Sequence, residues 1–426
     1  MRQLLEVFSV LAALALLATA CGPHASASMA QSSLSRDSAP GVPARDETVL
    51  VQGDNAFALD LYRSLRGGEG NLAFSPYSLS LALAMTYAGA RGDTASQMAQ
   101  TLHYTLPQDR LHPAFDQLDL ALAKEAEASE QAKNPLKLKI ANALWAEKTF
   151  SFLPDYLDIV ARNYGAGVQL ADFVNQSEAV RQQINNWVEK QTEGKIKDLI
   201  PAGALDSYTR MVLANAIYFK ADWQDQFDPN DTTDAPFYLL DGSQVTSKQM
   251  SQHMFAVPYA SGDGWQAVEL PYEGGTAAMD ILVPDDGTFR EFESRLDATR
   301  LDAILKSMQP ADLQLAMPKF TFRSAFDLGD SLSAMGMPDA FNADTGDFSG
   351  MDGRRDLYIG KVLHQAFIAV DEKGTEAAAA TAVTMQLAMA VNPGKTLTID
   401  HPFIFAIRDL NSGQILFLGR VLDASK

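Results

Sequence analysis

The stretch that decides the fold is VLHQAFIAVDEKGTEAAAATA, at residues 362–382, which passes from apolar residues through a short polar turn into an alanine-rich segment. The segment continues as VTMQLAM to residue 389. Alanine, methionine, glutamine and leucine are strong helix formers, so propensity alone predicts a helix over residues 377–389.

The same segment has a second interpretation, as a strand that can be buried in the middle of a sheet. Successive side chains of a strand point to opposite faces, so Thr375 would share its face with residues 377, 379, 381, 383 and 385. These residues are all small or apolar, and the one charge of the segment, Glu376, falls on the other face. No proline interrupts the segment before Pro393. The residues alone leave helix and strand both open.

Around this stretch the chain mixes helical and strand patterns without a regular strand–helix–strand rhythm, which favours an α+β fold. Apolar spacing predicts helices over residues 55–65, 76–88, 92–102 and 113–133. Alternating or continuously apolar runs predict strands at 136–145, 211–219 and 313–317, and a hairpin of strands 403–407 and 415–422. No second linker or repeat follows residue 49, so we expect one folded domain over residues 49–426.

Six stretches in order carry a resemblance to a known family. They are NLAFSPYSLSLALAMTYAGARGDT (71–94), LANAIYFKADW (213–223), MPKF (317–320), ADTGDFSGM (343–351), the stretch at 362–382, and HPFIFAIRDLNSGQILFLGRV (401–421). Together they resemble the serpin family over essentially residues 49–422. The resemblance implies the serpin fold, in which mixed sheets and surrounding helices carry an exposed reactive-centre loop near the C-terminus.

The resemblance also implies site residues. The shutter, beneath the point where a central sheet opens, matches Ser75, Ser78, Asn215 and His364. His364 is equally well interpreted as a buried histidine with satisfied hydrogen bonds. The breach, at the top of the same sheet, matches Trp223, Lys319 and Glu372, of which the last two would form an ion pair. The loop hinge matches Gly374, Thr375, Glu376, Ala377, Ala378, Ala379 and Ala380, and the family's spacing places the reactive bond between Ala388 and Met389.

The function that follows from this resemblance is suicide inhibition of a serine endopeptidase. The target peptidase cuts the loop, forms a covalent acyl complex and is trapped when the loop inserts as a strand. No lysine or arginine occurs from residue 375 to residue 394, so we expect an elastase-, subtilisin- or chymotrypsin-like target rather than a trypsin-like one. The alternative is a non-inhibitory serpin that acts as a binding or storage module. We expect a monomer in either case.

The sequence offers no catalytic motif of its own. It contains no Gly-x-Ser-x-Gly, His-Glu-x-x-His, P-loop or dinucleotide-binding pattern, and its six histidines do not pair at metal-ligand spacing. We therefore expect no catalytic residue, metal or cofactor, although a Ser-His-Asp triad built from distant residues stays open. The net charge of −19 argues against nucleic acid and anionic membrane surfaces as partners. The helix expected at 113–133 is acidic, which does not support a heparin-like activator.

The N-terminus is predicted to be a targeting segment. Arg2 precedes an apolar stretch at residues 7–20, which is too short to span a bilayer, so residues 1–20 are interpreted as a signal peptide. The sequence LATACG at 17–22 resembles a bacterial lipoprotein processing site and predicts lipidation of Cys21, the only cysteine; ordinary secretion is the alternative. Residues 21–48 are predicted to form a flexible tether. We expect an extracellular or cell-envelope protein, with no contact to a membrane except through such an anchor.

Overall fold

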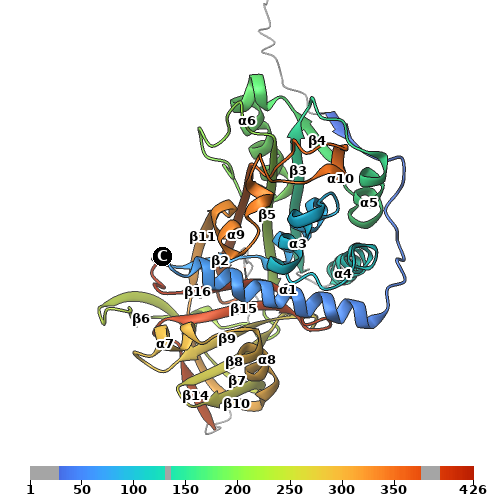
Figure 1. Cartoon of the computed structure of the whole chain (residues 1–426). Helices are drawn as coiled ribbons and strands as arrows, with labels where there is room; N and C mark the ends of the chain where they lie inside the picture. Colours follow the sequence, from blue (N-terminus) through green and yellow to red (C-terminus); the bar gives the residue numbers. More distant parts are fainter. Residues whose placement is uncertain (1–27, 130–135, 376–393) are drawn as a thin grey trace, which may run out of the picture.

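The fold combines two large sheets; most helices lie around the first of them, and α7 and α8 lie beside the second (Figure 1). The computed structural model describes residues 28–129, 136–375 and 394–426. Within these residues the first sheet has seven strands in the order β1-β4-β3-β5-β13-β12-β11. These strands are β1 Ser28–Ala30, β4 Val168–Ala171, β3 Lys137–Glu147, β5 Met211–Asp222, β13 Gly374–Thr375, β12 Lys361–Val370 and β11 Phe320–Asp327.

The second sheet lies below the first in Figure 1 and follows the order β14-β10-β7-β8-β9-β15-β16-β2, with β6 paired to β7. Its strands are β14 Lys395–Thr398, β10 Gln309–Pro318, β7 Gln244–Gly262, β8 Trp265–Pro271, β9 Ala277–Pro284, β15 Phe403–Asp409, β16 Ile415–Val421, β2 Leu72–Phe74 and β6 Thr233–Tyr238. The helices are α1 Ala44–Leu65, α2 Pro76–Tyr87, α3 Gly92–Thr101, α4 Gln108–Ser129, α5 Pro154–Tyr164, α6 Phe173–Gln191, α7 Phe289–Ser294, α8 Ala298–Ser307, α9 Gly329–Met335 and α10 Ser349–Asp352, and two 3-10 turns are η1 Pro229–Asp231 and η2 Pro338–Phe341.

Strand β5 is apolar on both faces because both faces of the first sheet are covered. Its odd-numbered residues, such as Leu213 and Ile217, belong to the main core shared with α2 and the second sheet. Its even-numbered residues, such as Val212 and Ala214, join a smaller cluster with α6. A strand buried on both sides loses the polar alternation of a surface strand, and this explains the continuous apolar run in the sequence.

The predicted α+β class and most of the expected elements are confirmed. Helix α2 begins at Pro76 with Ser75 as its N-cap, whose side chain accepts a hydrogen bond from the Ser78 backbone, and every residue of α2 is buried. Two helices begin earlier than predicted. Helix α1 begins at Ala44 rather than 55, because buried Leu50 and Val51 continue its apolar face toward the N-terminus. Helix α4 begins at Gln108 rather than 113.

The prediction of a flexible tether through residue 48 is wrong for residues 28–48. Strand β1 extends the edge of the first sheet by pairing with β4, and helix α1 has already begun at Ala44. Between them Arg36 Nε lies 2.6 Å from Asp116 Oδ1 and Arg36 Nη2 lies 2.7 Å from Asp119 Oδ2, both on α4. Composition suggested a tether because these contacts are long-range and leave no local apolar period. The predicted signal peptide at 1–20 and Cys21 lie outside the described residues.

Within those residues, no helix is long and apolar enough to cross a membrane. The same part of the chain holds no group of three or more metal-ligating side chains.

Candidate functional site

The shutter residues come together because three neighbouring strands present them at one level of the first sheet. Asn142 of β3 pairs directly with Asn215 of β5, and Asn215 pairs with His364 of β12. Helix α2 packs against β3 and β5 from the core side, with Ser75 and Ser78 in its first turn. The four residues that the serpin resemblance assigned to the shutter therefore lie together, although they come from three distant parts of the sequence.

The shutter is a closed hydrogen-bond cluster. The Ser75 backbone N–H donates to His364 Nε2 at 3.1 Å, and His364 Nδ1 contacts Asn215 Oδ1. The Asn215 amide donates to the Ser78 carbonyl at 2.8 Å and the Ser78 hydroxyl at 2.7 Å, and it also contacts Asn142 Oδ1. Asn142 in turn donates to the Ser78 carbonyl at 3.0 Å. These bonds tie β3, β5 and β12 to helix α2.

His364 is neutral in this cluster. The ring is fully buried, and burial lowers the pKa of His364 from 6.5 to about 3. Because Nε2 accepts a hydrogen bond from the Ser75 N–H, the proton of the neutral ring sits on Nδ1 and is directed at Asn215 Oδ1. A second proton on the ring would sit on Nε2 and would point at the Ser75 N–H, which is itself a donor. The interpretation of His364 as a satisfied buried histidine and its assignment to the shutter therefore describe the same arrangement.

Above the shutter the first sheet is partly open. Strands β5 and β12 pair directly, in parallel, only as far as Tyr218 and Phe367. Beyond that point they separate, and β13 lies between them, antiparallel to both. Strand β13 contains Gly374 and Thr375, the first two residues of the predicted hinge. The chain therefore enters the central sheet at its upper part and is described no further than Thr375.

Each of the two residues of β13 fits its place for a physical reason. A Cβ atom on Gly374 would lie 2.1 Å from the Ala221 carbonyl oxygen, so only glycine allows this close approach. Thr375 is 1% exposed, and its hydroxyl lies 2.6 Å from the Tyr272 hydroxyl. Tyr272 belongs to the main core, so the Thr375 side chain faces inward. The condition on which the strand interpretation depended, that Thr375 faces the core, is met.

The predicted breach residues surround this entry point. Trp223, directly after β5, stacks on Tyr272 with ring centroids 4.7 Å apart and planes 6° apart. Its indole N–H donates to the Asp371 carbonyl at 3.0 Å, and its backbone N–H donates to the Lys373 carbonyl at 2.6 Å. Trp223 thus holds the turn that joins β12 to β13.

Glu372 fixes the other side of that turn. Its carboxylate accepts hydrogen bonds from Lys319 Nζ at 2.7 Å and from the Thr232 hydroxyl at 2.8 Å. Burial opposes ionisation of this carboxyl, but the hydrogen bonds from Lys319 and Thr232 outweigh it and lower the pKa of Glu372. The carboxylate side chain is only 11% exposed, so the predicted ion pair is half hidden from water and is stronger than a surface pair.

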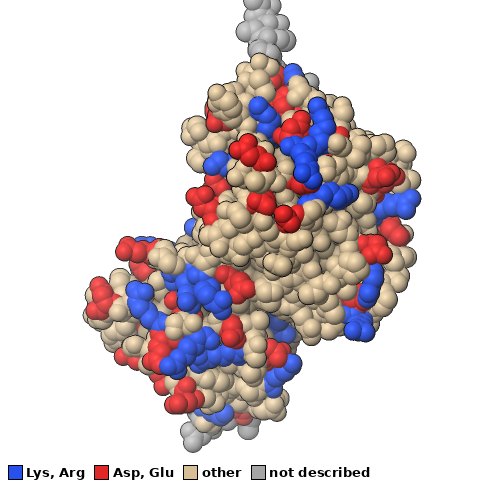
Figure 2. Space-filling model, in the orientation of Figure 1, with Lys and Arg blue, Asp and Glu red and all other residues tan. Residues whose placement is uncertain are grey.

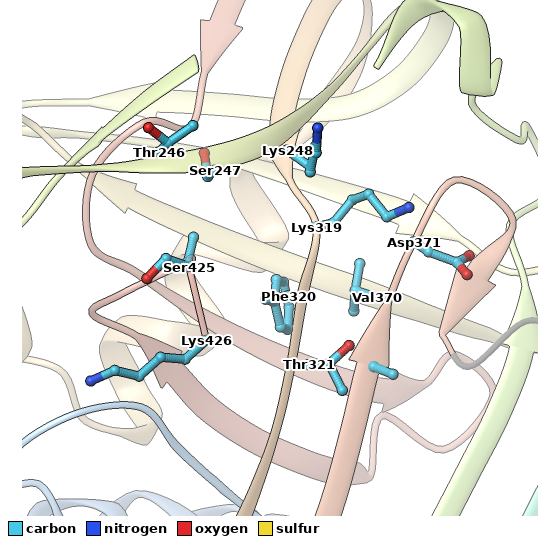
Figure 3. Close-up of a pocket in the computed structure, with 12 residues that line it drawn as sticks. Thr246, Ser247, Lys248, Lys319, Phe320, Thr321, Val370, Asp371, Ser425 and Lys426 are labelled. Carbon is cyan, nitrogen blue, oxygen red and sulfur yellow. The ribbon is translucent and has the colours of Figure 1, made fainter. Parts of the chain in front are cut away.

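A pocket of about 460 Å³ lies beside the breach (Figure 3). Phe320 and Val370 form its floor, and Lys319 extends across it toward the side of Asp371 and away from Lys426. Burial raises the pKa of Asp371, whose Oδ1 accepts hydrogen bonds from the backbone N–H groups of Lys373 and Gly374. Two polar residues of this pocket, Asp371 and Lys319, are therefore engaged in shaping the turn between β12 and β13.

The remaining predicted loop residues lie outside the described part of the chain. These are the hinge residues Glu376, Ala377, Ala378, Ala379 and Ala380 and the predicted reactive bond between Ala388 and Met389. The chain is described again from Gly394, and β14 begins at Lys395 by pairing with β10 in the second sheet.

Two residues of the site were missed from sequence. Asn142 joins the shutter from β3, and its signal was present: it is the one polar residue among 138, 140, 142, 144 and 146, which share the core face of an alternating strand. Tyr272 stacks on Trp223 and bonds Thr375, and no local pattern distinguishes it from an ordinary core tyrosine.

Comparison with known proteins agrees with this architecture. A family model described as serpin (serine protease inhibitor) matches residues 52–424. The chain is 40% identical over 382 residues to leukocyte elastase inhibitor A of Mus musculus, covering 87% of this chain and 98% of the relative. It is 42% identical over 380 residues to an uncharacterized serpin-like protein of Thermococcus kodakarensis, covering 88% and 86%. The crystal structure of the thermophilic serpin tengpin in its native state superposes with a TM-score of 0.81 at 27% identity, covering 93% of this chain and 99% of that one.

The family model matches almost the whole folded chain, and the strand order, the shutter, the breach and the entry of β13 into the first sheet agree with it. The protein therefore belongs to the serpin family of serine protease inhibitors.

Proposed function

We propose that this protein inhibits serine endopeptidases by loop cleavage, acyl-enzyme trapping and strand insertion. The observation that carries the proposal is the position of Thr375. It already lies between β5 and β12 with its side chain in the core. The cleaved loop would therefore need only to continue a strand that has begun, in the register that the pairings of Thr375 give.

Continuing the pairing of Thr375 with Ala221 of β5 brings residue 385 opposite Met211. Continuing its pairing with Val370 of β12 brings residue 384 opposite Lys361. The insertion therefore ends where β5 and β12 begin, and it accommodates residues 376–385. Residues 377, 379, 381, 383 and 385 would join Thr375 on the core side, and all are small or apolar. Glu376 would face outward, opposite Lys220 of β5.

Insertion is expected to stabilise the protein strongly. The ten inserted residues would form roughly twenty backbone hydrogen bonds with their two neighbours, while roughly seven between β5 and β12 would be lost. A net gain of about thirteen bonds at about 0.5–1.5 kcal/mol each is on the order of 10 kcal/mol. This equals the stability of an ordinary domain, so the uncleaved protein would be kinetically trapped.

The chemistry would be supplied by the target. Its serine attacks the Ala388 carbonyl carbon, the bond to the Met389 nitrogen breaks, and that nitrogen leaves with a proton from the peptidase histidine. Residue 388 stays bound to the serine as an ester. Insertion would then pull the ester away from the geometry that water needs to hydrolyse it. Inhibition requires insertion to be faster than hydrolysis of the ester.

The expected target class is elastase-, subtilisin- or chymotrypsin-like. The mouse relative is named a leukocyte elastase inhibitor. No basic residue lies between Thr375 and Lys395, so a peptidase that requires lysine or arginine before the cut bond has none to use.

The test is to incubate the purified protein with elastase and with subtilisin. We expect a complex that survives denaturing electrophoresis, and a released fragment whose mass corresponds to residues 389–426. Complete cleavage without any stable complex would contradict inhibition and would support a non-inhibitory serpin that binds or stores a ligand. A trypsin complex in the absence of an elastase complex would contradict the proposed target class.

Secretion or lipid anchoring at Cys21 also belongs to this proposal. Strand β1 pairs with β4, β4 with β3 and β3 with β5, and these pairings place the end of β1 at the level of Leu213 in β5. Strand β13 pairs with β5 at Ala221. These levels are roughly 26 Å apart along the strand. An anchor at Cys21 would therefore leave the loop at the end of the sheet that is farther from the membrane. We expect a fatty-acid analogue to label the wild type and not Cys21→Ser; an unlabelled wild type in the medium would instead support ordinary secretion.

Membrane or nucleic-acid surfaces are not expected as partners. Figure 2 shows positive and negative side chains interspersed on the face in view, and the net charge is −19. A partner of that kind would require clustered lysine and arginine. We expect the protein to act as a monomer, which gel filtration with light scattering would test.

A further inference from the structure

An exposed aromatic residue lies beside the carboxyl-terminal end of the loop. Phe255 is 58% exposed and belongs to β7, in which Met254 and Val257 are buried. At this point two residues of β7, Phe255 and Ala256, lie opposite the single residue Asp312 of β10, which forms a β-bulge. A bulge redirects the side chain of the extra residue, and here it leaves a large aromatic ring in solvent.

The bulge holds the ring in a defined position. Ala256 has a φ of +53°, a left-handed conformation that is unfavourable for alanine, and its N–H donates to Asp312 Oδ1 at 3.2 Å. The Phe255 ring packs on His253 with ring centroids 4.4 Å apart and planes 30° apart. Strained backbone of this kind persists where the surroundings impose it, and it occurs often at binding sites. Phe255 is thus both exposed and pre-organised.

The position of this bulge relative to the loop is fixed by strand pairing. Met254 of β7 pairs with Leu313 of β10, and Leu313 pairs with Lys395, the first residue of β14. Figure 1 shows β14, β10 and β7 together at the lower end of the molecule, and they are neighbours in this order in the second sheet. Neighbouring strands lie about 4.8 Å apart, so Met254 is roughly 10 Å from Lys395. Phe255 follows Met254 on the side of Gly394.

A bound peptidase must come close to this bulge. Five residue steps separate Met389 from Gly394, and they span at most about 17 Å. A peptidase domain of about 230 residues has a radius of roughly 22 Å. With the bond between residues 388 and 389 in its cleft, such a body extends past Gly394 over the ends of β14, β10 and β7.

We propose that Phe255, supported by His253 and the bulge at Ala256, is a docking surface for the target peptidase in the encounter complex. This inference rests on the proposed inhibitory function. Phe255 lies on the side of the residues that follow the cut bond, so the ring contacts the rim of the peptidase that holds the leaving segment. The partner is a peptidase with an apolar patch at that rim. A contact of this kind acts on recognition, before cleavage, and not on strand insertion.

The test compares Phe255→Ala with Tyr208→Ala, in which an exposed tyrosine is removed near the start of β5, at the opposite end of the first sheet. The second-order rate constant for inhibition of elastase and subtilisin is measured for each variant, together with the stoichiometry of inhibition and the half-life of the complex. We expect Phe255→Ala to slow association about tenfold with unchanged stoichiometry and half-life. We expect Tyr208→Ala to associate at the wild-type rate.

Two further variants separate docking from folding. Phe255→Trp retains an aromatic ring and should restore the rate, and Ala256→Gly relieves the backbone strain and should leave the ring in place. Association of Phe255→Ala at the rate of Tyr208→Ala, for both peptidases, would overturn the docking surface while leaving the proposed function intact. A wild-type protein that forms no complex with either peptidase would overturn the proposed function, and the docking surface with it.

Discussion

Replacing Thr375 by arginine tests the insertion mechanism at the residue where it begins. The Thr375 side chain is 1% exposed and bonds the Tyr272 hydroxyl at 2.6 Å in the core. An arginine there would place a guanidinium in the core beside Tyr272, where the buried Asp280 carboxylate, whose charge acts on Tyr272, is already paired with Arg408. Because β13 contributes two residues to the described part of the first sheet, the variant can withdraw them without unfolding the domain. We expect it to fold and to be cut normally, but to insert slowly.

The size of the effect follows from the cost of burying the charge. An unpaired buried charge costs several kcal/mol. If about 3 kcal/mol of that cost is added to the activation free energy of insertion, insertion slows about 150-fold, since each 1.36 kcal/mol changes a rate tenfold. Hydrolysis of the acyl-enzyme is a property of the peptidase and stays the same. The balance therefore shifts from trapping toward release of cleaved protein and active peptidase.

The assay is a titration of elastase with each protein, followed by electrophoresis that separates complex from cleaved inhibitor. We expect Thr375→Arg to need one to two orders of magnitude more inhibitor per inactivated peptidase. Thr375→Val is the matched control: it loses the bond to Tyr272, worth about 1 kcal/mol, but it keeps an apolar inward side chain and should still inhibit. Wild-type stoichiometry in Thr375→Arg would refute the register and the insertion argument together.

Three further changes test the shutter and the N-terminal segment. The pKa of His364 is lowered to about 3, whereas the unfolded histidine titrates near 6.5. The unfolded state therefore binds the extra proton first, and the free energy of unfolding falls as pH drops from about 6.5 toward 3, by about 3 kcal/mol at pH 4.5. The denaturant midpoint of the wild type should fall more steeply over this pH range than the midpoint of His364→Gln. Asn215→Ala removes a donor to the Ser78 carbonyl and leaves buried polar groups without partners. We expect the free energy of unfolding, measured in urea, to fall by about 2–4 kcal/mol. A fall below about 1 kcal/mol would contradict the stabilising role of the shutter hydrogen bonds. Arg36→Met leaves the fully buried Asp116 carboxylate without its cation and should lower the free energy of unfolding by about 1–3 kcal/mol. The control Arg45→Met changes an exposed arginine nearby in the N-terminal part of the chain and should lower it little. Equal effects of the two changes would mean that Arg36 does not hold the N-terminal segment in place.

Local signals in the sequence were sufficient for much of the fold. Ser75 followed by proline and an apolar run marked the start of α2, and the continuous apolar run of β5 marked a strand covered on both faces. These features depend on neighbours within a few residues, so propensity and periodicity detect them. The resemblance to serpins added the grouping of Ser75, Ser78, Asn215 and His364, which no local pattern contains.

What the residues alone did not predict depends on contacts between distant segments. The tether prediction failed because Arg36 is held by Asp116, eighty positions away, and β1 is held by β4. Tyr272 became part of the site only because the fold stacks it on Trp223. The choice between helix and strand for residues 377–389 is not local either, because a strand there is stable only when β5 and β12 are on both sides of it.

The most direct test of the account is the stability of the protein before and after one cut in the loop. Protein nicked between residues 388 and 389 should retain both fragments and unfold at a much higher temperature and denaturant concentration than the intact chain. The expected gain is on the order of 10 kcal/mol from the added strand. A nicked protein that unfolds under the same conditions as the intact one would contradict insertion of the loop between β5 and β12.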